Sequence, residues 1–260
     1  MAVPTMSHSN PGSDPDRDSG HRVSCVFPSR NEAQCLAHTV AEWAEVLPSF
    51  TRDHELIVVD DGSTDGTAEL LRELEARHPA LRVVSHGRNL GYGAAIATGF
   101  ARARFPLLFF TDADGQFDPA DLRRLLDRIG TADLVVGYRE RRSDSGLRRL
   151  LSNGYNATAR RMIGAPLRDI NCAFKLMHRE TFARLEVEST DFVFNAELVV
   201  SARRAGMSIA ELPVRHRPRF AGRSTVRLLH VLTSLRGLAL LRARERRSIV
   251  GAAHHSTNTS

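Results

Sequence analysis

The sequence predicts an α/β fold in which a mainly parallel sheet is flanked by helices, and three observations lead to this prediction. Segments with the composition of strands alternate with segments of helical periodicity along the first half of the chain. Residues Leu107–Phe110 are uninterruptedly apolar, which is typical of a strand buried on both faces of a parallel sheet. Acidic residues follow three of the predicted strands, at the edge where open α/β sheets bind their ligands.

The predicted elements can be placed in order along the chain. The predicted strands are Arg22–Phe27, Glu55–Val59, Leu81–Ser85, Leu107–Phe110 and Asp133–Gly137. The predicted helices begin after Ser29 and at Thr67, Ala94 and Asp118, and they end near Leu47, Arg77, Ala103 and Ile129. Pro28 is expected to end the first strand because proline lacks a backbone N–H. The chain beyond Gly137 is less regular, and no further strand is predicted there.

Length and composition indicate one large domain with appended segments. The 260 residues, of which 42% are hydrophobic, suffice for a substantial core. The first 21 residues are rich in Ser, Pro, Gly and Asp, so we expect a disordered tail rather than a secretory signal. The expected organisation is a tail at 1–21, a folded domain at 22–225, a basic amphipathic helix at 226–248 and a disordered tail at 249–260.

The cysteines and the apolar runs bear on the location of the protein. Cys25, Cys35 and Cys172 form no CxxC pair and no metal-binding spacing, which favours reduced thiols in a cytosolic protein. No run of about 20 apolar residues occurs, so no membrane span is expected. The leucines and arginines of 226–248 resemble a helix that lies on an anionic leaflet, and packing on its own domain or on a second subunit is the alternative. The expected location is cytoplasmic, with peripheral contact at the cytoplasmic membrane face if this helix binds lipid.

The charge of the chain calls for an anionic partner. The net charge is +6, and Lys175 is the only lysine among 36 basic residues. Arginine suits bidentate recognition of phosphate, so an anionic substrate or membrane face is favoured. A basic nucleotide- or nucleic-acid-binding protein without transferase activity is the rival of another class. Few aromatic residues lie beside the basic clusters and no zinc-finger spacing occurs, so no nucleic-acid partner is expected.

The segment Asp112-Ala113-Asp114-Gly115-Gln116 is the strongest chemical signal. Residues two apart point the same way in an extended chain, so the two carboxylates and Gln116 would converge on one small volume. Hard divalent cations such as Mg²⁺ or Mn²⁺ prefer such oxygen ligands, especially beside substrate phosphates. The alternative is a strand-ending turn in which Asp118 and Pro119 cap the next helix. Taken alone, this segment leaves both interpretations open.

The acids at other strand ends favour a nucleotide. Glu32 follows the first strand, and Asp60 and Asp61 follow the second. Some of these acids can accept hydrogen bonds from ribose hydroxyls or base N–H groups while others hold a metal, a division that fits a nucleoside diphosphate. The Gly91-x-Gly93 turn opens a helix as a dinucleotide-binding loop would, but its GxGxxG pattern is incomplete. An oxidoreductase is therefore a weak rival, and close packing of the glycines is the structural alternative.

Five sequence motifs occur in order along the chain. They are Val26–Glu32, Ile57–Thr67, Asn89–Ala95, Asp112–Gln116 and Asp169–Lys175. Together they resemble a family 2 glycosyltransferase of the GT-A fold, in the branch of the polyprenol (dolichol) phosphate mannosyltransferases, and the resemblance covers about residues 22–225. It implies an inverting hexosyltransferase that takes its sugar from a donor of the GDP-mannose, UDP-glucose or UDP-GlcNAc type. The implied acceptor is a polyprenyl phosphate.

The resemblance also implies which residues bind the donor. Segment 219–224 resembles the family's Arg-x-x-Gly-x-Ser loop, which closes over the diphosphate. Asp112, Asp114 and Gln116 match the site for Mg²⁺ or Mn²⁺, and Asp114 and Arg219 are also expected to act in catalysis. The expected donor-binding residues are Pro28, Glu32, Asp60, Asp61, Asp112, Ala113, Asp114, Gln116 and Arg219.

The acceptor side has two open interpretations. A phosphate acceptor is already an anion and needs no general base, and the resemblance implies that Arg139, Arg148 and Ser224 orient it. A hydroxyl acceptor, in a cell-envelope glycan or a small molecule, would need a carboxylate to take its proton. Asp191 and Glu197 are the candidates for that base.

Overall fold

The computed structural model describes residues 20–140, 154, 167–219, 221 and 237. Its strands are β1 Arg22–Ser29, β2 Asp53–Asp60, β3 Leu81–Ser85, β4 Leu107–Thr111, β5 Leu134–Arg139, β6 Phe174–His178 and β7 Ile209–Val214. Its helices are α1 Ala33–Val46, the short 3-10 helix η1 Leu47–Ser49, α2 Thr67–Arg77, α3 Tyr92–Arg102, α4 Asp121–Ile129, α6 Arg179–Ala183 and α7 Phe194–Arg204. Every strand and helix predicted between residues 22 and 137 is present, with ends shifted by a few residues.

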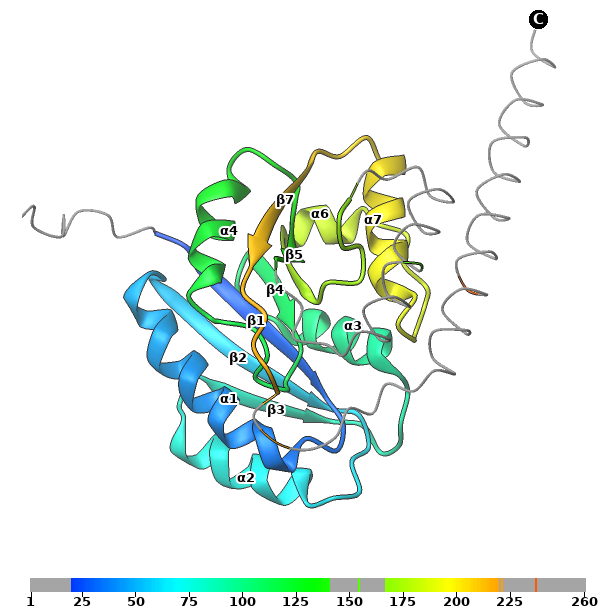
Figure 1. The fold of residues 1–260 in the computed structure, drawn as a ribbon. Coiled ribbons are helices and arrows are strands. Elements are labelled where there is room, and N and C mark those ends of the chain that lie inside the picture. The colour runs from blue at the N-terminus through cyan, green and yellow to red at the C-terminus, as the bar shows by residue number, and fades with distance from the viewer. Residues whose placement is uncertain (1–19, 141–153, 155–166, 220, 222–236, 238–260) are drawn as a thin grey trace, which may run out of the picture.

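In the described part of the chain, seven strands form one sheet in the order β3-β2-β1-β4-β6-β5-β7. Strands β1 to β4 are mutually parallel, and β5 pairs with β7 in parallel. Helix α1 packs against α2 and α3 packs against α7, and the two pairs lie on opposite faces of the sheet (Figure 1). The predicted α/β fold with a mainly parallel sheet is confirmed.

Strand β1 continues through Pro28 to Ser29, so the prediction that proline ends this strand is wrong. Pro28 lies opposite Val59 of β2. On the other side of β1, the pairing with β4 stops at Val26 and Phe110. No β4 residue is therefore paired opposite Pro28, and its missing N–H interrupts no ladder there, which is the setting in which strands tolerate proline.

The second half contains β6, α6, α7 and β7, which the sequence did not predict. Strand β6 lies antiparallel between β4 and β5. Its sequence, Phe-Lys-Leu-Met-His, places a lysine in the middle, and lysine is seldom fully buried. Lys175 is nevertheless fully buried, because hydrogen-bond acceptors surround its ammonium group. A buried strand with a charged centre has no signature in the sequence pattern.

A cluster of aromatic side chains packs helix α1 against strands β1 and β4. Trp43 of α1 is buried, and its ring lies 5.2 Å from Phe27 of β1 and 5.4 Å from Phe109 of β4, between centroids. The ring of Phe174 on β6 lies 4.7 Å from that of Phe109. Because these rings interlock, the ends of β1 and β4 are held at a fixed spacing.

Several predictions concern residues outside those that the structure describes. These are nearly all of the tail 1–21, the tail 249–260, and the helix 226–248 apart from Gly237. Gly237 is helical and lies so close to Val193 that a Cβ on the glycine would collide with that side chain.

Among the described helices, none combines the length and apolar character needed to cross a membrane.

Candidate active site

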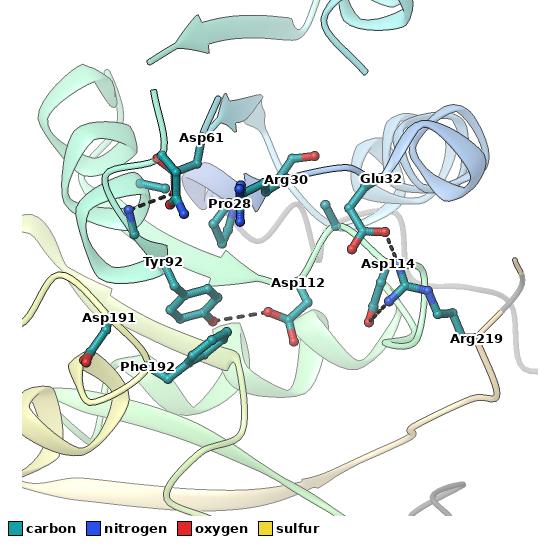
Figure 2. A pocket seen from close by; sticks show the side chains of 15 residues that line it. Pro28, Arg30, Glu32, Asp61, Tyr92, Asp112, Asp114, Asp191, Phe192 and Arg219 are labelled. Carbon is teal, nitrogen blue, oxygen red and sulfur yellow. Dashed lines mark hydrogen bonds and ion pairs between the residues drawn. The ribbon is translucent and has the colours of Figure 1, made fainter. Parts of the chain in front are cut away.

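A pocket of about 310 Å³ lies at the carboxyl ends of β1, β2 and β4 (Figure 2). Its lining residues are Pro28, Ser29, Arg30, Glu32, Asp61, Asn89, Gly91, Tyr92, Ala95, Asp112, Ala113, Asp114, Asp191, Phe192 and Arg219. Parallel strands bring their carboxyl ends to one edge, so acids from three separate strand ends meet here. The start of α3, the loop before α7 and the segment after β7 complete the walls.

Asp112 and Asp114 both line the pocket, although they do not lie in an extended segment. Strand β4 ends at Thr111, and the chain then turns, with Gly115 at a φ of +71°. The Asp114 carboxylate accepts a hydrogen bond from the backbone N–H of Gln116 at 3.1 Å. One oxygen of Asp112 accepts a hydrogen bond from the Tyr92 hydroxyl at 3.2 Å. A turn, rather than strand alternation, therefore brings the two carboxylates to one wall.

The electrostatics of this pair favour a bound cation. Burial, and after it the charge of Asp114, raise the pKa of Asp112 to about 7. Burial also raises the pKa of Asp114, against the opposing effects of the Gln116 N–H and of Arg219. Two ionised carboxylates at this distance repel each other. A divalent cation bound between them would offset that repulsion.

Arg219 is a basic residue of the pocket that lies beside Asp114. Its guanidinium forms an ion pair with Glu32 and lies 3.7 Å from the Asp114 carboxylate (Figure 2). The Arg219 side chain is 16% exposed and that of Asp114 is 14% exposed, so neither charge is fully hydrated. Arg219 therefore occupies a position in which it can contact any anion that enters between these acids.

Segment 215–219, which follows β7, carries Arg219 to the pocket. Its alternate arginines pair with acids of the first half of the chain: Arg215 with Asp118 and Asp121, Arg217 with Glu42 and Asp118, and Arg219 with Glu32 and Asp114. The Arg217 N–H donates to the Gln116 carbonyl at 2.7 Å, and the Gln116 side-chain amide donates to the Arg217 carbonyl at 3.1 Å. The place of Arg219 is thus set by contacts between distant parts of the sequence.

Asp61 lines the pocket while it holds the loop before α3. Its Oδ1 accepts the Leu90 N–H at 2.7 Å and lies 2.8 Å from His86 Nδ1, and its Oδ2 accepts the Gly91 N–H at 2.9 Å. Asp60 instead accepts the backbone N–H and hydroxyl of Ser63 and is not among the lining residues. Of the two neighbouring acids, only Asp61 faces the pocket.

Tyr92 and Phe192 form an aromatic wall beside Asp112 (Figure 2). Their rings stack with centroids 4.9 Å apart and planes 24° apart. The Gly93 N–H donates to the Thr190 carbonyl at 2.7 Å, and a Cβ on Gly91 would collide with the same carbonyl oxygen. The glycines of the Gly91-x-Gly93 turn thus permit close packing of a loop onto α3. Because Thr190 occupies the N-terminal N–H groups of α3, the comparison with a dinucleotide-binding loop does not hold.

Residues 24–185 match the family described as glycosyl transferase family 2. The chain belongs to this family. The resemblance stated from the sequence motifs is therefore confirmed, and the oxidoreductase and nucleic-acid interpretations are set aside.

Three relatives show how this glycosyltransferase compares with named proteins. Glycosyltransferase AglD of Haloferax volcanii is 35% identical over 210 residues, which are 77% of this chain and 34% of AglD. Polyprenol monophosphomannose synthase of Mycolicibacterium smegmatis is 30% identical over 236 residues, covering 85% of this chain and 88% of the synthase. Undecaprenyl-phosphate mannosyltransferase of Micrococcus luteus is 29% identical over 216 residues, covering 78% and 86%. The chain thus spans about a third of AglD but most of the other two.

Solved structures establish the fold of this glycosyltransferase as GT-A. Glucosyl-3-phosphoglycerate synthase of Mycobacterium tuberculosis, in complex with Mn²⁺, UDP-glucose and phosphoglyceric acid, gives a TM-score of 0.64 at 23% identity and covers 91% of this chain and 86% of its own. Mannosyl-3-phosphoglycerate synthase of Rubrobacter xylanophilus gives 0.65 at 21% identity and covers 91% and 77%.

The pocket of this glycosyltransferase fits a divalent metal that is shared with a donor. In the described ranges, no group of three or more His, Cys, Asp or Glu side chains could hold an ion alone. Asp112 and Asp114 supply two carboxylates, and Mg²⁺ is commonly held by one or two carboxylates plus substrate phosphates. Complexes with Mn²⁺ or Mg²⁺ and a uridine nucleotide exist among structures of similar fold. Gln116, predicted as a third ligand, is absent from the pocket lining, and its side chain bonds to the Arg217 carbonyl.

Among the described residues predicted for the acceptor side, only Asp191 lines the pocket. Arg139 forms a bidentate ion pair with Asp169, at 2.6 and 3.0 Å, and is not among the lining residues. Glu197 accepts the backbone N–H groups of Glu188 and Ser189 at 3.0 and 2.7 Å, so it holds the loop before α7. Asp191 does line the pocket and accepts the Val193 N–H at 2.8 Å. Arg148 and Ser224 lie outside the described residues.

Sequence reasoning did not select several residues that the structure brings to the site. Tyr92 and Phe192 line the pocket, and Lys175 donates a hydrogen bond to Asn195 at the start of α7. Tyr92 and Lys175 stand within the motif segments, and Phe192 and Asn195 stand beside the acids Asp191 and Glu197. Their position within or beside the motif segments could have indicated these residues. A motif match does not show which side chains are in contact.

Proposed function

We propose that this glycosyltransferase moves a hexose from a nucleoside-diphosphate sugar to a polyprenyl phosphate, with inversion at the anomeric carbon. The observation that carries the proposal is the Asp112–Asp114 pair facing Arg219 within one pocket at the carboxyl edge of the sheet. Relatives that match most of their length are named as a polyprenol monophosphomannose synthase and an undecaprenyl-phosphate mannosyltransferase. Their names support the lipid-phosphate acceptor, and the pocket supports the donor.

The nucleoside would lie on the β1–β2 side of the pocket. Pro28, Glu32 and Asp61 line that side, and Arg30 lines it where a base could stack. Asp61 is already held by His86 and two backbone N–H groups, so its carboxylate is fixed before the donor arrives. A fixed acceptor for a ribose hydroxyl or a base N–H costs little ordering on binding.

The diphosphate would lie between the acid pair and Arg219. Asp112 and Asp114 would hold Mg²⁺ or Mn²⁺, which when bound neutralises the diphosphate and the charge that develops as it leaves. Arg219 would exchange its contacts with Glu32 and Asp114 for the diphosphate oxygens and stabilise the same charge from the other side. The guanidinium suits this role because its charge persists at any working pH and its N–H groups form a fork.

A phosphate acceptor attacks without a general base because it is already ionised. Arg139, Arg148 and Ser224 are proposed to orient it. Arg139 is held at the end of β5 by Asp169, so its guanidinium has a defined orientation. This part of the proposal rests on the sequence resemblance and on the relatives' names.

A hydroxyl acceptor is the second candidate, and the presence of Asp191 in the pocket favours it. Asp191 would take the hydroxyl proton, whereas Glu197 is engaged by two backbone N–H groups and lines no part of the pocket. The two acceptors therefore predict opposite outcomes for Asp191→Asn. Transfer to a hydroxyl would be lost, and transfer to a lipid phosphate would persist.

Direct transfer assays test the proposal. The protein is incubated with Mn²⁺ or Mg²⁺, radiolabelled GDP-mannose, UDP-glucose or UDP-GlcNAc, and vesicles containing undecaprenyl phosphate or dolichyl phosphate. We expect one donor to give a labelled lipid that extracts into organic solvent and is cleaved by mild acid. Label that enters only water-soluble hydroxyl acceptors would exclude the lipid-phosphate acceptor, and hydrolysis without transfer would exclude both.

Peripheral membrane contact through residues 226–248 is part of the proposal, and it rests on the leucine–arginine pattern of that segment. Co-sedimentation with anionic vesicles compares the full chain with a chain ending before Leu228. We expect binding to fall on truncation and with rising salt, since the attraction is electrostatic as well as apolar. Equal binding by a folded truncated chain would exclude this segment as the contact.

A further inference from the structure

His86 is a buried polar side chain that lies behind the nucleoside side of the pocket. It follows β3 directly, and its side chain is 8% exposed. Its Nδ1 lies 2.8 Å from Oδ1 of Asp61, and its Nε2 lies 3.0 Å from the hydroxyl of Thr98 on α3. Both ring nitrogens are therefore engaged by other side chains, and His86 itself is not among the residues that line the pocket.

The contacts of Asp61 determine where the proton of the imidazole lies. The Asp61 carboxylate also accepts the backbone N–H groups of Leu90 and Gly91, so it acts as an acceptor toward its neighbours. Nδ1 of His86 must therefore carry a proton and donate it to Asp61. In the neutral ring Nε2 carries no proton, so it accepts the hydroxyl proton of Thr98. Thr98 thus orients the imidazole, and the imidazole donates to Asp61.

These donors leave Asp61 one acceptor position for a ligand. An ionised carboxylate has about four lone-pair positions. Two donors, His86 and Leu90, approach Oδ1, and the Gly91 N–H approaches Oδ2. The remaining position is on Oδ2, and its direction is set because both oxygens are held. The Asp61 side chain is only 6% exposed, so water has little access with which to replace a lost donor.

We propose that His86, oriented by Thr98, is a positioning residue that fixes the Asp61 carboxylate to bind the nucleoside of the donor. This inference rests on the proposed role of Asp61 in the donor site. The free position on Oδ2 would accept one N–H group of the base or one ribose hydroxyl. Because the carboxylate is already fixed, little further ordering is needed when the nucleotide binds.

Three variants break or restore these contacts one at a time. His86→Phe keeps a planar ring but removes the donor to Asp61 and the acceptor for Thr98. His86→Asn restores the donor, because the side-chain amide nitrogen of asparagine can take the place of Nδ1. Thr98→Val keeps the shape of the side chain and removes only the hydroxyl that orients the imidazole.

The readout is isothermal titration calorimetry with UDP, GDP and inorganic pyrophosphate, each in the presence of Mn²⁺. Pyrophosphate is the probe that lacks a nucleoside. For the nucleotide that the parent protein binds, we expect His86→Phe to weaken binding about 10-fold and to leave pyrophosphate binding unchanged. Thr98→Val should weaken nucleotide binding about 3-fold, since it loosens the imidazole without removing it. His86→Asn should bind the nucleotide like the parent protein.

Steady-state kinetics provide a second readout. In His86→Phe the KM for the donor should rise while kcat stays unchanged, because a contact with the nucleoside is equally strong in the ground state and the transition state. A fall in kcat at unchanged KM would overturn the positioning role, since it would place the effect of His86 on the reacting groups.

His54→Phe is the matched control. Its ring nitrogen Nδ1 lies 3.2 Å from the hydroxyl of Thr51, so it belongs to a second Thr–His pair, but neither residue lines the pocket. This variant should bind nucleotide and pyrophosphate like the parent protein.

Thermal unfolding of each variant shows which of them fold. Unchanged nucleotide binding in folded His86→Phe, or equal weakening of nucleotide and pyrophosphate, would overturn the positioning role and leave the proposed function standing. If His86→Phe does not fold, unchanged nucleotide binding in Thr98→Val would overturn it instead. A parent protein that binds neither UDP nor GDP would overturn both the inference and the proposed function.

Discussion

The charged side chains in the two halves of the sheet have different surroundings. In the half formed by β1 to β4, which we propose binds the donor and call the donor half, Glu32, Asp112 and Asp114 line the pocket. In the half formed by β5 to β7, Arg139 is paired with Asp169 and Glu197 with two backbone N–H groups. Most acids of the pocket therefore come from the first half, whereas Arg139 and Glu197 of the second half fix a side chain and a loop.

This difference indicates how the site is built. Parallel strands with short connections deliver acids to one edge, but those acids raise one another's pKa and need cations. The second half supplies a compensating positive charge, because Arg219 after β7 lies 3.7 Å from the Asp114 carboxylate. Breaking groups of each kind should therefore have different consequences.

The largest expected effect comes from the acid pair. Asp114→Ala should lower the rate of sugar transfer about 10³-fold, because a metal-binding carboxylate supports several kcal/mol of charge stabilisation. The fold should persist, since the pKa of Asp114 is raised and its ionisation opposes folding. Transfer rates and unfolding curves of the variant and of Glu69→Ala, a surface acid paired with Arg72, would be compared. Metal-independent transfer by Asp114→Ala would contradict the metal site.

Arg219 should come next. Arg219→Ala should lower kcat about 10²-fold, as expected for one lost group that stabilises a developing anion. Arg215→Ala is the matched control, because Arg215 belongs to the same segment but pairs with Asp118 and Asp121 away from the pocket. Steady-state kinetics at saturating metal would separate the two. Equal losses of kcat in both variants would mean that segment 215–219 only stabilises the fold.

The raised pKa of Asp112 predicts a smaller effect on stability in the absence of metal. The folded protein keeps the Asp112 proton up to about pH 7, whereas the unfolded chain releases it near 3.8. Folding therefore binds a proton between these values, and this group makes the free energy of unfolding fall as the pH rises from about 4 to about 7. Urea unfolding with EDTA across this range should show a shallower fall in Asp112→Asn. An identical slope in the variant would assign the pH dependence to other groups.

The smallest expected effect concerns the contact between the halves at α3. Gly91→Ala should destabilise the protein by about 1–3 kcal/mol, because a Cβ there collides with the Thr190 carbonyl and the backbone φ is +106°. Gly130→Ala is the control, since nothing lies within 4 Å of its Cβ position. Chemical unfolding would measure both. Equal stability of the two variants would show that the loop before α7 moves away without cost.

The sequence by itself determined the donor half. Apolar runs of strand length alternate with helical periods there, so order, type and approximate ends of the elements follow from local pattern, and strand-end acids mark the binding edge. Even so, Asp112 and Asp114 are brought together by a turn at Ala113 and Asp114 rather than by strand alternation. The motif segments were enough to indicate family 2 of the glycosyltransferases.

Only the tertiary structure decided the second half and the completion of the site. Strand β6 is antiparallel and has a lysine at its centre, which becomes favourable only once Asn195 and two carbonyl groups surround it. The encounter of Arg219 with Glu32 and Asp114 joins residues far apart in the chain, and no local pattern encodes such a contact. Local propensity specifies elements, whereas the pairing of buried charges depends on which elements the fold brings together.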